Sequence, residues 1–218
     1  MRNFIDLSFY LVTNREMLKD IRLPELVESA VQNGVTVVQL REKKASTREF
    51  VELAIELKKV LDPLNIPLII NDRVDVALAT DASGVHLGQN DMPVSIARKL
   101  LGKDKVIGLS VETEADLDTL HALKPDYLGV SPIFNTPTKT DTVQEWGLDG
   151  LKSVSQRVDY PLVAIGGINI ENARSMIEHG ADGIAVVSAI CASEDPGRST
   201  AELRDKIDKV IKPKMQGI

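Results

Sequence analysis

The chain has 218 residues, 43% of them hydrophobic and 27% charged, and its 26 Lys and Arg against 32 Asp and Glu leave a formal net charge of −6. This composition is that of a globular protein long enough to bury its core without disulfides or a structural metal. The single cysteine, Cys191, excludes a disulfide framework and a multi-cysteine metal site, and the acidic balance argues against broad contact with nucleic acid.

The sequence also lacks the pattern of a membrane protein. No stretch approaches the ~18 consecutive apolar residues of a membrane span. Asp6 interrupts what would be the apolar region of a signal peptide. We therefore expect a soluble, cytoplasmic protein with no membrane or nucleic-acid partner, and a homo-oligomer remains compatible with the sequence.

Short β-branched segments alternate with longer segments of helical periodicity along the whole chain. The expected strands are residues 9–13, 36–41, 67–72, 84–88, 106–111, 127–134, 161–167 and 183–190. Between them, Ser46 and Glu49 have the spacing of a capping box before a helix, and Thr113 and Asp116 repeat it. Asn169 is expected to cap the helix after the seventh strand, and Gly180 to end it.

Eight strand-and-helix repeats without alternation of polarity inside the strands predict a parallel sheet covered by helices. In a chain of this length the pattern favours an α/β fold of the TIM-barrel type, a (β/α)8 barrel that forms a single domain over residues 1–218. An open doubly wound sheet is the alternative, because a sequence does not show closure. In a barrel, functional residues gather at the carboxyl ends of the strands.

Basic residues follow the second strand. Gln39 and Arg41 have the same parity, so both are expected to face the barrel interior, and Lys43 continues the polar set into the loop. An Arg and a Lys that converge at a barrel mouth suit a phosphate or pyrophosphate. An ion pair with Glu42 or with a neighbouring strand end is the structural alternative.

Acidic residues follow the third and fourth strands. Asn71 and Asp72 end the third strand, and Gln89 and Asp91 lie in the loop after the fourth. Two carboxylates at neighbouring strand ends, without cysteine or a histidine cluster, suit Mg²⁺ whose other ligands are water and phosphate. Alternatively, each Asp caps the helix that follows it.

Polar residues follow the remaining strands as well. Ser110 ends the fifth strand and can donate to an oxyanion or a heterocycle, but with no histidine near it in the sequence it is expected to be a poor nucleophile. Thr136, Thr138 and Lys139 lie on a loop long enough to close over a ligand, although an ordinary exposed turn would look the same.

A double glycine, Gly166 and Gly167, ends the seventh strand, and Ser188 lies toward the end of the eighth, at the entrance to the next helix. Together they predict the usual phosphate site of a barrel, where backbone N–H groups approach the ligand.

The histidines His86, His121 and His179 form no catalytic pattern, and we expect structural roles for them. The inventory therefore contains two anion sites and a metal site but neither an obvious nucleophile nor a general base. Such a set suits the binding of two phosphorylated substrates and the departure of pyrophosphate.

These motifs together resemble the thiamine-phosphate synthase family, also called thiamine-phosphate pyrophosphorylases. The similarity runs through the whole chain in the segments YLVT, QLREK, INDR, GVHLGQND, GLS, SPIF, TPTK, AIGGI and GADGIAVVSAI. It implies that a hydroxymethylpyrimidine diphosphate and a thiazole phosphate, plain or carboxylated, combine into thiamine phosphate with release of pyrophosphate. Two positions depart from the family pattern: Asn14 replaces an expected Asp, and residues 140–146 are not Pro-rich.

The resemblance also implies roles for individual residues. The pyrimidine-diphosphate contacts would be Gln39, Leu40, Arg41, Glu42, Lys43, Asn71, Ser110 and Lys139. The Mg²⁺ ligands would be Asp72 and Asp91. The thiazole-phosphate site would consist of Thr136, Pro137, Thr138, Gly167, Val187 and Ser188. The catalytic residues would be Arg41, Lys43, Ser110 and Lys139.

Other functions are compatible with parts of the pattern. A thiazole tautomerase or regulatory paralogue of the same fold would keep the thiazole-phosphate half without the complete diphosphate half that is present here. A phosphosugar isomerase or epimerase would share the phosphate site but should show acid and base residues at several strand ends. A non-catalytic binding module would not need the metal and diphosphate set.

Overall fold

The structure is a computed structural model that describes residues 5–135 and 145–215. Eight parallel strands close into a barrel in sequence order, and β8 pairs with β1 to complete it. The strands are β1 Phe9–Val12, β2 Val37–Leu40, β3 Leu68–Asn71, β4 Gly84–Leu87, β5 Val106–Val111, β6 Tyr127–Val130, β7 Leu162–Ile165 and β8 Gly183–Val186. The prediction of a (β/α)8 barrel is confirmed, and the open-sheet alternative is wrong.

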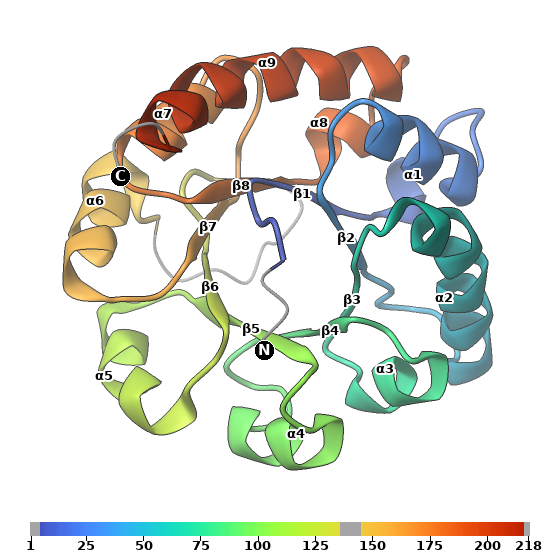
Figure 1. The fold of residues 1–218 in the computed structure, drawn as a ribbon, viewed down its shortest axis with the longest axis horizontal. Helices are drawn as coiled ribbons and strands as arrows, with labels where there is room; N and C mark the ends of the chain where they lie inside the picture. Colours follow the sequence, from blue (N-terminus) through green and yellow to red (C-terminus); the bar gives the residue numbers. More distant parts are fainter. Residues whose placement is uncertain (1–4, 136–144, 216–218) are drawn as a thin grey trace.

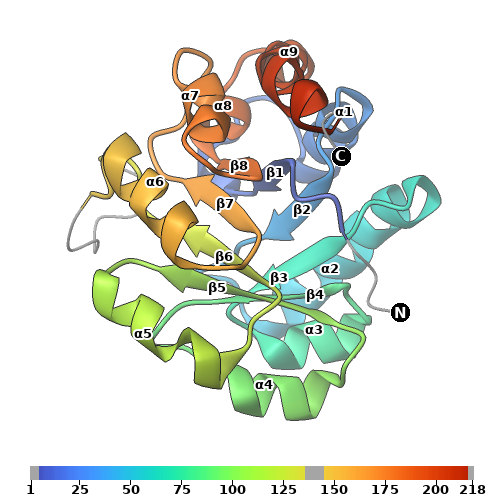
Figure 2. The ribbon, with the colours of Figure 1, turned by 60° about the vertical axis from the view of Figure 1, so that its left-hand side comes forward.

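Helices surround the barrel on the outside, as Figure 1 shows in the view through its centre and Figure 2 from the side. They are α1 Leu23–Gln32, α2 Thr47–Leu61, α3 Val74–Thr80, α4 Val94–Leu101, α5 Glu114–Leu123, α6 Gly147–Arg157, α7 Ala173–Glu178, α8 Ser188–Cys191 and α9 Pro196–Met215, with the 3-10 turns η1 Arg15–Met17 and η2 Asp62–Leu64. None of the helices in the described ranges is both long and apolar enough to cross a membrane.

The helix starts follow local hydrogen bonds. At the start of α2, the Ser46 hydroxyl accepts from the Glu49 N–H and the Glu49 carboxylate accepts from the Ser46 N–H, both at 3.3 Å, so the predicted capping box is confirmed. The prediction for α7 is wrong, because the helix begins three residues later with Asn172 as its N-cap. Asn169 instead accepts from the Glu171 N–H and closes the turn that precedes the helix.

The two faces of the strands pack into separate cores. Outward-facing side chains, including Val38 and Leu40, pack against the helices in one large buried cluster. Inward-facing side chains form a second cluster inside the barrel, made of Tyr10, Val12, Val37, Ile69, Val106, Tyr127, Val163 and Ala185. Because alternate residues point to opposite faces, the parity of each strand decides which residues can reach the barrel interior.

Candidate active site

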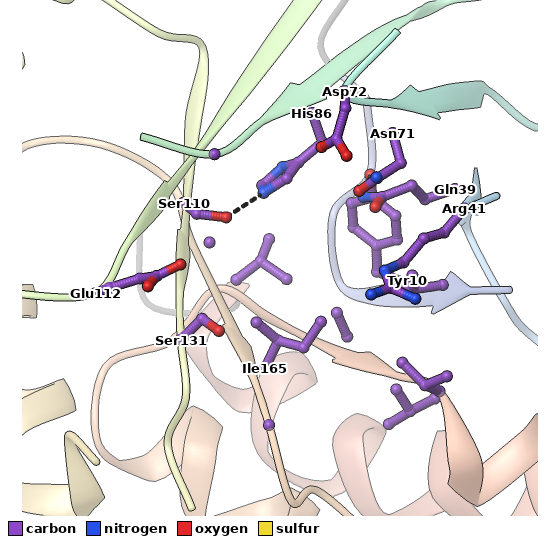
Figure 3. A pocket seen from close by; sticks show the side chains of 18 of the residues that line it. Tyr10, Gln39, Arg41, Asn71, Asp72, His86, Ser110, Glu112, Ser131 and Ile165 are labelled. Atoms are coloured by element: carbon purple, nitrogen blue, oxygen red, sulfur yellow. Dashed lines mark hydrogen bonds between the residues drawn. The ribbon is translucent and has the colours of Figure 1, made fainter. Parts of the chain in front are cut away.

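A cavity of about 400 Å³ opens at the carboxyl ends of the strands, and all eight strands or the loops after them contribute to its wall. It includes the predicted residues Gln39, Arg41, Lys43, Asn71, Asp72, Asp91, Ser110, Gly167, Val187 and Ser188. Figure 3 shows several of these side chains pointing into the same space from different strands. Thr136, Pro137, Thr138 and Lys139 lie outside the described residues, so their roles stay predictions.

The two cations at the cavity differ in their surroundings. The Arg41 backbone N–H donates to the Thr13 hydroxyl at 3.1 Å, but its guanidinium makes no ion pair with any residue in the described ranges. Lys43 Nζ donates to a carboxylate oxygen of Asp72 at 2.6 Å and is half exposed. The Arg41 charge is therefore available to an anion, whereas that of Lys43 is shared with the acidic loop.

The carboxyl groups of Asp72 and Asp91 lie together although they follow different strands. Burial is the main cause that raises the pKa of Asp91, and the neighbouring Asp72 carboxyl raises it further, while the Gly88 N–H, which donates to Asp91 at 2.7 Å, opposes the rise. The helix-cap alternative is wrong, since the N-caps are Arg73 for α3 and Pro93 for α4.

This acidic pair has the oxygen donors that Mg²⁺ prefers, and a cation would relieve the repulsion between the two carboxylates. In the part of the chain that the structure describes, no group of three or more His, Cys, Asp or Glu residues is placed to hold a metal. Two protein carboxylates with water and phosphate as the other ligands are a usual arrangement for Mg²⁺. Asp72 and Asp91 therefore fit the predicted ion.

Asn71 presents a further donor to the cavity. Its side chain is buried, and its Nδ2 is the one buried side-chain nitrogen or oxygen in the described residues that lacks a hydrogen-bond partner. A buried donor without a partner costs roughly 1–3 kcal/mol. Asn71 is one of the residues that line the cavity (Figure 3).

Two residues predicted as substrate contacts do not present their side chains to this cavity. Leu40 packs in the outer core against the helices, because its parity is opposite to that of Gln39 and Arg41. Glu42 accepts two hydrogen bonds from the Arg15 guanidinium, at 2.8 and 2.7 Å, and its side chain is only 7% exposed. The Glu42 pair with Arg15 fixes the segment that carries Arg41 and Lys43.

Breaking that pair should destabilise the fold. Glu42→Gln is expected to lower the free energy of unfolding by roughly 1–3 kcal/mol, because it leaves the Arg15 guanidinium without its charged partner. Urea denaturation of the two proteins measures the loss. Glu16→Gln, which breaks an exposed pair with Lys44, is the control and should change stability by less than about 1 kcal/mol. Equal losses in both variants would contradict a special role for Glu42.

The end of the cavity where the sequence predicts a phosphate site is formed by the loops after β7 and β8. Gly166 and Gly167 have φ angles of +105° and +67°, and a Cβ on Gly167 would lie 2.8 Å from the Cβ of Phe134. Both positions therefore require glycine, which leaves their backbone open to the cavity. Ser188 and Val187 line the same end.

The departure at Asn14 has a local explanation. Its side chain accepts from the Glu16 N–H at 3.0 Å and caps the short η1 turn. An Asn performs this capping as well as an Asp. The other departure, residues 140–146, lies mostly outside the described residues.

Sequence reasoning did not single out several other residues of the cavity wall: Tyr10, His86, Glu112, Tyr127 and Ile165. His86, for which we expected a structural role, lies in the cavity wall beside Ser110 (Figure 3). The signal was present in the strand pattern, since Val85 and Leu87 face the helices and the residue between them must face inward. His121 and His179 lie on or after outer helices, away from the cavity.

Comparisons with known proteins identify the family of the chain. Residues 9–190 match the family described as thiamine monophosphate synthase. Curated thiamine-phosphate synthases from Albidiferax ferrireducens and Leptospira biflexa are 55% and 53% identical to the chain, covering 94% of it and 93% and 100% of their own lengths.

A solved structure is similar over nearly its whole length. The structure is described as thiamine phosphate pyrophosphorylase from Pyrococcus furiosus; it superposes with a TM-score of 0.86 at 38% identity and covers 94% of this chain and 98% of its own. The chain therefore belongs to the thiamine monophosphate synthase family, and its function is that of a transferase in thiamine biosynthesis.

Proposed function

We propose that this enzyme joins a 4-amino-2-methyl-5-hydroxymethylpyrimidine diphosphate to a 4-methyl-5-(2-phosphoethyl)thiazole, plain or carboxylated, to give thiamine phosphate and pyrophosphate, with loss of CO2 as well when the thiazole is carboxylated. The observation that supports this most is the composition of one cavity. Among the described residues, the Arg41 guanidinium has no ion pair and the buried Asn71 amide nitrogen has no hydrogen-bond partner, and both residues line the cavity together with the acidic pair. A diphosphate with its bound cation would supply a negative charge to Arg41, a hydrogen-bond acceptor to Asn71 and a positive charge to the two carboxylates.

In the proposed reaction the bond between the pyrimidine methylene carbon and the diphosphate oxygen breaks, and its electron pair leaves with the oxygen. Arg41 and Lys43 stabilise the negative charge that develops on the departing pyrophosphate. Asn71 donates to one of its oxygens. Lys139, which the family resemblance adds to this group, stays a prediction.

Asp72 and Asp91 would hold Mg²⁺ beside the diphosphate. When bound, the ion supplies a positive charge that stabilises the leaving group. The ion pair between Lys43 and Asp72 links this acidic pair to the basic loop, so the residues at the ends of β2 and β3 are positioned together.

The second bond forms between the thiazole nitrogen and the methylene carbon. The thiazole phosphate would be held by the backbone of Gly167 and by Val187 and Ser188, at the side of the cavity formed by β7 and β8. The nitrogen supplies the electron pair of the new bond and no proton has to be removed from it. This explains why the wall needs donors and cations rather than a general base.

Measuring both products tests the proposed function. Incubation with both substrates and Mg²⁺ should give one pyrophosphate per thiamine phosphate, detected by mass spectrometry and a coupled pyrophosphate assay. Leaving out the thiazole phosphate should abolish the coupled product. Release of orthophosphate without pyrophosphate would contradict the proposed bond cleavage.

A further inference from the structure

A chain of hydrogen bonds crosses the barrel beneath the site and ends at Ser110. We propose that this buried chain, formed by Gln39, Tyr10, Tyr127, His86 and Ser110, makes Ser110 a fixed hydrogen-bond donor to the substrate. Tyr127 and His86 then act as positioning residues. The inference deepens the proposed function and rests on it for the identity of the substrate.

The chain is continuous, and each member comes from a different strand. Gln39 Nε2 donates to the Tyr10 hydroxyl at 3.0 Å, and the Tyr10 and Tyr127 hydroxyl oxygens are 2.9 Å apart. The Tyr127 hydroxyl lies 2.9 Å from Nδ1 of His86, and Nε2 of His86 lies 2.9 Å from the Ser110 Oγ. Figure 3 shows the last of these bonds at the cavity wall.

The number of protons decides the direction of these bonds. Tyr10 accepts from the amide of Gln39, so its single hydroxyl proton has to go to Tyr127. Tyr127 in turn donates its proton to Nδ1 of His86, and a neutral imidazole then carries its own proton on Nε2. His86 therefore donates to Ser110. The Ser110 hydroxyl proton points away from His86 and is available to a ligand in the cavity.

The opposite direction would leave a buried proton unsatisfied. If Tyr127 donated to Tyr10, the Tyr10 hydroxyl would accept two hydrogen bonds, and its own proton would have no acceptor in the described part of the chain. Both phenols are almost fully buried, and this burial raises the pKa of each well above its ordinary value, so both keep their protons. Buried hydroxyls without a partner are rare for this reason.

Glycines make room for the chain where it crosses the barrel. A Cβ on Gly108 would overlap the Tyr127 ring and lie 2.5 Å from Nδ1 of His86. A Cβ on Gly129 would lie 2.9 Å from Cε1 of His86. The neighbouring strands therefore hold the His86 and Tyr127 rings closely, and the rings cannot turn without leaving their hydrogen bonds.

Ser110 is also held from its backbone, since Gln89 Nε2 donates to its carbonyl oxygen at 2.6 Å. Its oriented hydroxyl faces the cavity that contains Arg41 and Asn71. The substrate atom that it meets must be an acceptor with a lone pair, either a ring nitrogen of the aminopyrimidine or an oxygen of the diphosphate. A donor that is already oriented before binding loses little further freedom, which favours tight positioning.

Nitrogen NMR of the substrate-free protein tests the direction of the chain independently of the reaction. The protein has three histidines, and a His86→Gln variant identifies the signals of His86. At pH about 8 the spectrum should show His86 protonated on Nε2 and unprotonated on Nδ1. In Tyr127→Phe the Nδ1-protonated form should increase, because the phenol proton is gone. A wild-type His86 protonated on Nδ1 would overturn the proposal, whatever the outcome of the activity assay.

A double-mutant cycle tests whether Tyr127 acts through Ser110. Tyr127→Phe is expected to lower kcat/KM for the diphosphate substrate roughly three- to tenfold, the net value of one hydrogen bond. In a Ser110→Ala background the same change should lower it by at most about twofold. Tyr160→Phe, which removes a hydroxyl bonded to the Leu120 carbonyl on the outside of the barrel, is the control and should leave kcat/KM unchanged. Additive effects of Tyr127→Phe and Ser110→Ala would overturn the proposal.

Calorimetry with two probes identifies the acceptor. Inorganic pyrophosphate with Mg²⁺ represents the diphosphate, and the hydroxymethylpyrimidine without phosphates represents the ring. Tyr127→Phe should weaken binding of the pyrimidine alone if Ser110 donates to the ring, and of pyrophosphate alone if it donates to the diphosphate. Unchanged binding of both probes in Tyr127→Phe and in Ser110→Ala would overturn the role of Ser110 as an oriented donor.

Discussion

Replacing either Asp72 or Asp91 with Asn is expected to lower the Mg²⁺-dependent activity by at least about 100-fold, because each variant loses one of the two carboxylates proposed to hold the ion. The double variant should be little worse than the worse single variant, since residues that act as a unit are not additive. The measurement is activity against Mg²⁺ concentration for the three variants.

Stability measurements separate this loss from misfolding. Neither carboxylate caps a helix and neither belongs to the core, so thermal unfolding of the variants should stay close to that of the wild type. Asp75→Asn is a matched control, because Asp75 lies three residues after Asp72 but pairs with Arg73 outside the cavity. Wild-type Mg²⁺ profiles in the Asp72 and Asp91 variants would contradict the metal assignment.

Arg41→Gln is expected to lower kcat by roughly 100- to 1,000-fold, the usual effect of removing one donor that stabilises a developing negative charge. The Arg41 guanidinium makes no ion pair with a described residue. Its removal is therefore expected to weaken the contact with the ligand rather than a contact within the protein. KM for the thiazole phosphate should change far less, because we propose that the other end of the cavity binds that substrate. Steady-state kinetics with each substrate varied in turn separates the two constants.

Lys44→Gln is the control for Arg41→Gln, since Lys44 lies three residues later, is exposed, and pairs with Glu16 away from the cavity. It should reduce kcat by less than about twofold. An equal loss in both variants would indicate a general effect of net charge. A large rise in KM for the thiazole phosphate with unchanged kcat would instead move Arg41 to the other subsite.

The barrel could be predicted because its signal is periodic and spread over the whole chain. Eight buried runs separated by amphipathic segments leave few arrangements for parallel strands. The same alternation correctly placed Gln39 and Arg41 inside the barrel. It also implied that the Leu40 side chain faces outward, where the structure has it; the place of Leu40 among the contacts comes from the family resemblance and stays a prediction.

Contacts between distant strands could not be read from the sequence. The hydrogen bonds that join Tyr10, Tyr127 and His86 connect residues up to 117 positions apart, and only the curvature of the closed barrel brings them together. The pair formed by Arg15 and Glu42 has the same origin, since it joins the loops after β1 and β2. The start of α7 was predicted wrongly for a local reason. Asn169 and Asn172 are both suitable N-cap residues, but Asn169 closes the turn before the helix and Asn172 is the N-cap.

A crystal of the protein with Mn²⁺ and pyrophosphate would test the proposed diphosphate and metal site, because Mn²⁺ can replace Mg²⁺ and its anomalous scattering locates it. We expect Mn²⁺ bound by carboxylate oxygens of Asp72 and Asp91, with pyrophosphate oxygens among its other ligands and the Arg41 guanidinium on the pyrophosphate. Pyrophosphate bound at the other end of the cavity, beside Gly167 and Ser188, with no Mn²⁺ at the acidic pair would contradict it.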